Sequence, residues 1–111
     1  MASRLLTFAV HRGRLVRQVR RWGGRTSRRS CTLGVFEDVA WYLQEHWGEG
    51  LSATGLWRAL PGAARTQVHV AMDFLLEQGC LVRCGRRSYG TSPSLYEDAL
   101  GVFHHLAEIG T

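Results

Sequence analysis

The feature that most constrains the fold is a change of hydrophobic period along the chain. Between Cys31 and Gly79, apolar residues recur every three or four positions, as in helices that bury one face. Over residues 81–91 the period becomes two, interrupted by a turn that contains Gly and Arg, as in two short strands. The helical period returns over about residues 95–109. We therefore expect an α+β protein that is mainly α.

Three helices are predicted in the first of these stretches, over residues 33–47, residues 52–60 and residues 64–78. Ser52 suits the N-cap of the second helix, and Gly79 suits the C-terminal end of the third. The expected core positions are Phe36, Val39, Ala40, Leu43 and Trp47, then Leu56, Trp57 and Leu60, then Val68, Ala71, Met72, Leu75 and Leu76. On the third helix, Val70 and Phe74 would add apolar surface.

The order of these elements is that of a winged helix-turn-helix domain. It runs helix, short strand at Leu51, helix, turn, helix, hairpin and helix. The expected fold therefore has a three-helix core, a two-stranded wing and a C-terminal helix over residues 32–111. In such domains the third helix reads the major groove of DNA, and the hairpin is the wing.

A family resemblance supports this reading. Arg65-Thr-Gln-Val-His-Val-Ala71, followed by Leu75, Gly79, Leu81-Val-Arg83 and Gly85, resembles the reading helix and wing of GntR-type regulators, and MarR, ArsR and BlaI-type domains share its general form. The resemblance covers about 30 residues well and about 60 loosely. The chain departs from the GntR pattern at Ala64, where Ser is usual, and at His69, where Arg is usual. The family's Pro-Ser-Glu-Arg-Glu-Leu signature is missing from the second helix, and too few residues follow the wing for its effector domain. The resemblance therefore implies that Arg65 and His69 face DNA, and it implies no effector ligand.

Side-chain chemistry extends these DNA-contact predictions beyond the resemblance. Arg pairs with guanine O6 and N7, and Gln pairs with adenine N6 and N7. Arginines at a wing tip suit phosphates or the minor groove. The predicted contacts are Arg65, Thr66, Gln67 and His69 on the helix and Arg83, Arg86 and Arg87 on the wing.

Charge divides the chain into two parts. Residues 1–36 hold nine of the 14 basic residues, all of them Arg, and no acidic residue. Residues 37–111 hold five Arg against nine acidic residues. We therefore expect residues 1–31 to form a basic arm, flexible or a small hairpin, that binds phosphates bidentately. Its predicted DNA contacts are Arg25, Arg28 and Arg29.

Two other interpretations of this arm stay open. Its Arg-rich, acid-free start is typical of a mitochondrial transit peptide. Its apolar residues could instead form a β-hairpin on the domain, with Leu5, Phe8 and Val10 before the turn His11-Arg-Gly-Arg14 and Leu15, Val16 and Val19 after it. In any of these cases residues 22–30 are expected to be a flexible linker.

Other classes of protein are disfavoured by the pattern. The spacing of Cys80 and Cys84 and the adjacent pair His104-His105 do not match a zinc site, so no metal and no cofactor are expected. The chain lacks a phosphate loop, a nucleophile elbow and a zinc-protease motif, so we expect no enzyme. No apolar run approaches the about 20 residues of a membrane span. Three cysteines without framework spacing favour a reducing compartment, expected to be the cytoplasm, or the mitochondrion if the arm is a transit peptide.

These features predict a transcriptional regulator that binds double-stranded DNA. The long apolar stripe of the C-terminal helix suggests a homodimer through that helix. The alternative is a winged-helix protein-interaction module in a larger complex, with the Arg-rich arm contacting RNA or DNA.

Overall fold

The computed structural model describes residues 4–21, 23–46, 52–84 and 89–109 of the chain. These residues form a mixed α+β fold with a three-stranded sheet, a two-stranded sheet and four helices. The elements are β1 (Arg4–His11), β2 (Arg14–Arg21), β3 (Thr26–Thr32), α1 (Leu33–Glu45), α2 (Ala53–Ala59), α3 (Arg65–Glu77), β4 (Val82–Arg83), β5 (Tyr89–Gly90) and α4 (Leu95–Ile109). Each predicted helix is present within a few residues of its expected bounds. The strand expected at Leu51 and the core position expected at Trp47 lie outside the described residues.

The N-terminal residues form an antiparallel sheet in the order β1-β2-β3. β1 and β2 pair from Arg4↔Arg21 to His11↔Arg14, so two residues connect them. Those two residues, Arg12 and Gly13, both have positive φ (52° and 76°), as a tight hairpin turn requires. This confirms the hairpin interpretation. A transit peptide that included this hairpin would remove two strands of the fold when it was cleaved.

The prediction of a flexible linker over residues 22–30 is wrong for residues 26–30, because these residues lie in β3. This strand pairs with β2 from Arg14↔Thr32 to Arg20↔Thr26. Its sequence has no alternating apolar pattern, and Cys31 is its only buried residue. The strand therefore forms because β2 offers a second edge with unpaired backbone groups, rather than because of its own propensity.

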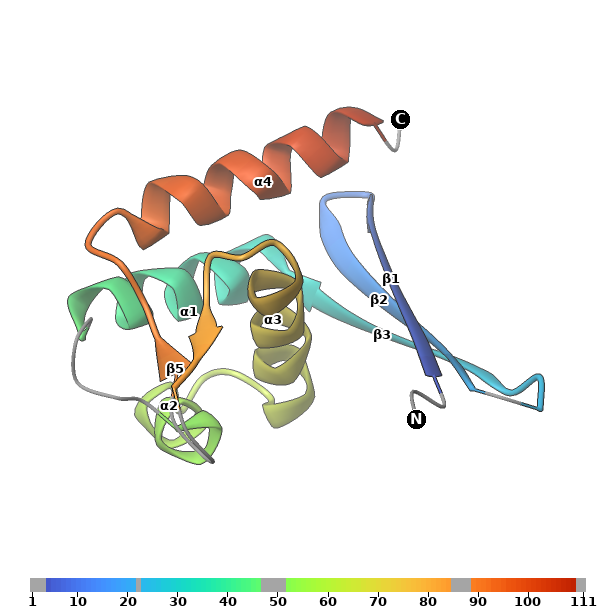
Figure 1. The fold of residues 1–111 in the computed structure, drawn as a ribbon, viewed down its shortest axis with the longest axis horizontal. Helices are drawn as coiled ribbons and strands as arrows, with labels where there is room; N and C mark the ends of the chain where they lie inside the picture. Colours follow the sequence, from blue (N-terminus) through green and yellow to red (C-terminus); the bar gives the residue numbers. More distant parts are fainter. Residues whose placement is uncertain (1–3, 22, 47–51, 85–88, 110–111) are drawn as a thin grey trace.

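Helix α3 is the centre of the core, lying between α1 on one side and the sheet on the other (Figure 1). The ring of Phe74 contacts Phe36 of α1 at 5.9 Å and Phe8 of β1 at 5.3 Å between ring centroids. Val70 and Phe74 are both fully buried, because the sheet covers that side of α3, so the apolar surface that they add to the helix belongs to the core. Val10, Leu15 and Cys31 of the sheet belong to the same core cluster as the helices.

Helix α4 packs on α1 and on β1 (Figure 1). Its Phe103 ring lies 5.2 Å from Phe36, and Leu95 and Ala99 are fully buried. The apolar stripe that suggested a homodimer is thus covered largely by the chain itself, and Ile109 is the residue left exposed at its end. None of the helices in the described residues is long and apolar enough to cross a membrane.

Burial of Cys31 makes the stability of the fold depend on pH. Burial raises the pKa of this thiol from 9.0 to about 12, and the positive charge of Arg14 opposes the rise. Above pH 9 the unfolded chain ionises this thiol and the folded chain does not. The free energy of unfolding should therefore fall by about 1.4 kcal/mol per pH unit from this group as the pH rises from 9 towards 12.

Urea denaturation across this pH range measures that slope. Cys31→Ala should flatten it, whereas Cys84→Ala, at an exposed position, should keep the wild-type slope. Equal slopes in wild type and Cys31→Ala would contradict the assignment.

Candidate nucleic-acid interface

The first turn of α3 presents three of the predicted contact residues to solvent. The helix begins at Arg65. Arg65 and Thr66 are exposed and His69 is half-buried. The guanidinium carbon of Arg65 lies 5.4 Å from the centre of the Trp57 ring of α2, a cation–π contact that orients the side chain. These residues therefore form one strip of the helix, which is exposed at Arg65 and Thr66 and partly covered at His69.

Gln67 lies apart from this strip, on the side of α3 that meets the sheet. Its Oε1 accepts a hydrogen bond from the backbone N–H of Thr32 at 3.0 Å. The Thr32 hydroxyl in turn accepts from Val35 N–H at 3.2 Å and caps α1. Gln67 thus ties α3 to the junction of β3 and α1, and reading adenine through both amide atoms would break this bond.

Substitutions at the adjacent positions 66 and 67 should show that Gln67 anchors the helix and that Thr66 does not. Gln67→Ala leaves a part-buried N–H of Thr32 without its acceptor and should lower the free energy of unfolding by about 1–2 kcal/mol. Thr66→Ala, at an exposed position, should change it by less than about 0.5 kcal/mol. Chemical denaturation of both variants measures this. Equal losses of stability would mean that Gln67 does not anchor the helix.

An ion pair fixes the sheet against α3. Arg17 Nη1 of β2 lies 2.6 Å from Asp73 Oδ2, and the two side chains are only 16% and 24% exposed. The pair also neutralises Asp73, whose charge would otherwise repel phosphate near the first turn of α3. Among the described side chains of the sheet, Arg17 is the arginine that forms an ion pair.

The remaining arginines divide between the two faces of the sheet. Residues that oppose each other in antiparallel strands point to the same face, and neighbours along a strand alternate. Since Leu15, Arg17 and Cys31 face the helices, the face on the α3 side also carries Arg21 and Arg29. Arg25 opposes Arg21 at the end of the hairpin, where Arg21 N–H donates to Arg25 C=O at 2.8 Å. We call Arg21, Arg25 and Arg29 the α3-side arginines.

The opposite face carries Arg14, Arg20 and Arg28, which we call the outer-face arginines. Arg14 donates to Ser30 Oγ at 3.0 Å, and Arg28 donates to Gln18 Oε1 at 3.2 Å. Of the arm residues expected to contact DNA, the structure thus brings Arg25 and Arg29 to the side of α3, and it places Arg28 on the other face.

Of the two-stranded sheet, the structure describes the strands β4 and β5, and residues 85–88 between them lie outside the described residues. Arg83 on β4 is exposed, and its guanidinium carbon lies 5.5 Å from the centre of the Tyr89 ring on β5. β4 and β5 pair antiparallel, as expected for a wing. Arg86 and Arg87, the predicted contacts at its tip, lie outside the described residues.

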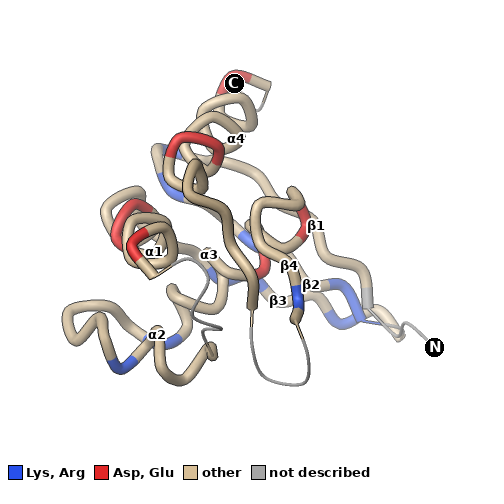
Figure 2. The backbone as a smooth tube through the Cα atoms, turned by 60° about the vertical axis from the view of Figure 1, so that its left-hand side comes forward, with Lys and Arg blue, Asp and Glu red and all other residues tan. Residues whose placement is uncertain are grey.

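Charge is separated across the molecule. Figure 2 shows acidic residues on α1, α4 and α3, and basic residues along the three-stranded sheet, with further ones on α2, α3 and β4. The described strands β1 to β3 contain no acidic residue. The sheet is therefore the surface that can attract a polyanion, and the α1–α4 side would repel one.

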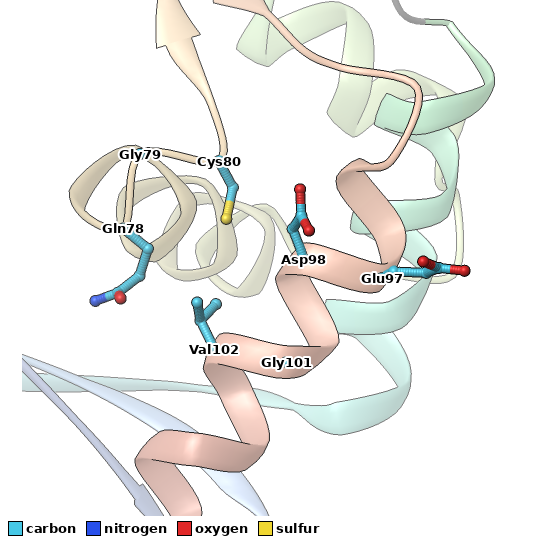
Figure 3. A pocket seen from close by; sticks show the side chains of 7 residues that line it. All are labelled: Gln78, Gly79, Cys80, Glu97, Asp98, Gly101 and Val102. Carbon is cyan, nitrogen blue, oxygen red and sulfur yellow. The ribbon is translucent and has the colours of Figure 1, made fainter.

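A hollow between the end of α3 and α4 differs in chemistry from the basic sheet. Its volume is about 430 Å³, and it is lined by Gln78, Gly79, Cys80, Glu97, Asp98, Gly101 and Val102. Burial, followed by the nearby Asp98 charge, raises the pKa of the Cys80 thiol, which therefore stays protonated and is a poor nucleophile. Glu97 points away from Cys80 (Figure 3). Within the described residues there is no group of three or more His, Cys, Asp or Glu that could hold a metal ion.

Comparison of the chain with protein-family models, with curated proteins and with solved structures found no match. Function must therefore be inferred from the surface itself. Its distinguishing features are the exposed first turn of α3 and the unpaired arginines on the same side of an acid-free sheet.

Proposed function

We propose that the chain is a winged helix-turn-helix protein that binds double-stranded DNA on the α3 side of its basic sheet. In this proposal α1, α2 and α3 are the three-helix core, β4 and β5 are the base of the wing, and α4 is the C-terminal helix. Arg65, Thr66 and His69 contact base edges, and the α3-side arginines contact phosphates. As part of the same proposal, the chain acts as a cytoplasmic transcriptional regulator, a role that requires sequence-specific binding.

The strongest support for this proposal is that the first turn of α3 and the α3-side arginines lie on the same side of the sheet. Gln67 joins α3 to the end of β3 at Thr32, and the α3-side arginines continue from there along the strand. At about 3.3 Å per residue, Arg25 lies about 20 Å along β3 from Cys31. This length matches about six base pairs of a duplex. One duplex could therefore contact the first turn of α3 and the sheet together.

The sheet favours a duplex over a single strand. Proteins that bind single-stranded nucleic acid stack the bases on exposed aromatic side chains. In the described part of β1 to β3 the aromatic residue is Phe8, and it is packed against Phe74. Within the described strands the guanidinium groups therefore have no exposed aromatic platform beside them, and such groups suit a regular phosphate backbone.

A second candidate is a protein-interaction module whose basic sheet holds nucleic acid without reading it. The observation that favours it is on the α1–α4 side. Trp41 of α1 is 50% exposed and meets Tyr96 of α4 edge to face at 5.3 Å, beside exposed acidic residues. A basic protein partner would fit this side.

Binding of the full chain to random-sequence DNA, followed by sequence selection, tests the proposal. Fluorescence anisotropy should show a Kd that rises steeply between about 50 and 200 mM salt, and a duplex should bind more tightly than a single strand of equal length. Selection should enrich a short motif, and Arg65→Ala should relax one position of it. Binding without any enriched motif would favour the interaction module, and no binding at low salt would contradict both.

A further inference from the structure

The β2–β3 turn carries a cationic pocket separate from the first turn of α3. The pocket is lined by the α3-side arginines together with Thr26 and Ser27, and its volume is about 360 Å³. Among the described residues of the turn, Arg21 N–H donates to Arg25 C=O at 2.8 Å and Gly24 N–H donates to Arg21 C=O at 3.1 Å. Gly23 and Gly24 have φ near 100° (102° and 95°), a conformation that side chains with a Cβ rarely adopt. The backbone therefore holds Arg21 and Arg25 opposite each other.

The donors of this pocket are not used by carboxylates of the chain. None of the three arginines forms an ion pair with a described residue. Nη1 of Arg29 donates to the backbone carbonyl of Arg28 at 2.9 Å, which orients that guanidinium and leaves its other N–H groups available. The rest of the lining is Ser27, which by the register lies on the same face as Arg29, and Thr26, which opposes Arg20.

A single DNA phosphodiester can use only part of this donor set, so along a duplex the three arginines would contact separate phosphates. A phosphodiester carries one negative charge and two non-bridging oxygens. A phosphate monoester carries about 1.5–2 negative charges at pH 7 and has three strong acceptor oxygens. Three guanidinium groups, which bind such oxygens bidentately, match the monoester better.

We propose that this pocket binds a dianionic phosphate monoester, presented by the 5′ end of a DNA strand or by a free nucleotide. The first source rests on the proposed function, and the second does not. A duplex that ends at the β2–β3 turn would place its terminal phosphate about 20 Å along β3 from the contacts made by α3.

The test compares two DNA hairpins that each have a single 5′ end, one with a 5′-phosphate and one with a 5′-hydroxyl. Both carry the dye in the loop, and anisotropy gives the Kd of the full chain for each. The wild type should bind the phosphorylated hairpin about tenfold more tightly. Arg25→Gln with Arg29→Gln should remove this preference. The charge-matched control, Arg14→Gln with Arg20→Gln on the outer face, should keep it. Thermal unfolding of both double variants shows that they are folded.

A competitor distinguishes the two sources. Adenosine monophosphate at millimolar concentration should abolish the preference if the pocket takes a free nucleotide, and should leave it if the pocket needs a strand end. Equal Kd values for the two hairpins, together with no binding of adenosine monophosphate detected by calorimetry, would overturn the proposal. Because the 5′-hydroxyl hairpin can still bind through α3 and the sheet, that result would leave the proposed function standing. Failure of both hairpins to bind would count against the proposed function instead.

Discussion

A chain shortened to residues 32–111 should fail to fold, although the charge pattern marks residues 1–31 as a separable arm. The sheet supplies Leu15 and Cys31, both without exposed surface, to the core that contains α3. Its removal would expose Val70 and Phe74, which the sheet covers. A domain of about 80 residues has little stability to lose. Circular dichroism and urea denaturation of the shortened chain should show no cooperative unfolding.

A point substitution tests the same contact without deletion. Phe74→Ala should lower the free energy of unfolding by about 3–5 kcal/mol, because its ring packs between Phe8 and Phe36. The control is Leu5→Ala at a position that is 60% exposed on β1, and it should cost less than about 0.5 kcal/mol. If the shortened chain unfolds cooperatively with near wild-type stability, the sheet is not part of the core.

Neutralising the α3-side arginines should weaken DNA binding about 10- to 100-fold near physiological salt. The variant combines Arg21→Gln, Arg25→Gln and Arg29→Gln. Each arginine is expected to neutralise one phosphate, and loss of three such contacts removes their counterion release. A combined loss of about 1.4–2.7 kcal/mol corresponds to this range of Kd. Anisotropy with a 5′-hydroxyl duplex measures it without the terminal-phosphate contact.

The outer-face arginines provide a control of identical charge. Arg14→Gln, Arg20→Gln and Arg28→Gln change the net charge of the protein by the same amount. They lie on the opposite face of the same strands, so the Kd should rise less than about threefold, through long-range attraction alone. Equal weakening by both triple variants would mean that net charge, and not a defined face, controls binding.

The helices could be predicted from the sequence because their signals are local. Phe36, Val39 and Leu43 recur at helical spacing, and all three are fully buried. The hairpin of β1 and β2 is signalled in the same way, by apolar residues on both sides of a two-residue turn. The third strand had no such signal, because β3 buries one residue and exists through its pairing with β2.

The arrangement of the candidate interface depends on partners that are distant in sequence. Gln67 and Asp73 look like ordinary polar positions of a helix, but their partners are Thr32 and Arg17, which are 35 and 56 residues away. The separation of Arg28 from Arg29 depends on the register of β3 against β2, and a shift of one residue would exchange the two faces. The sequence therefore indicates a basic surface without indicating which arginines share a side with α3.

The measurement that tests the central proposal most directly is the salt dependence of DNA binding by three proteins: the wild type, the α3-side triple variant and the outer-face triple variant. The slope of log K against log salt changes by about 0.9 for each phosphate contact. If the duplex lies on the α3 side of the sheet, the α3-side variant should lose about 2.7 from the wild-type slope, and the outer-face variant should keep it. An unchanged slope in the α3-side variant, or a larger loss in the outer-face variant, would contradict the proposed placement of DNA.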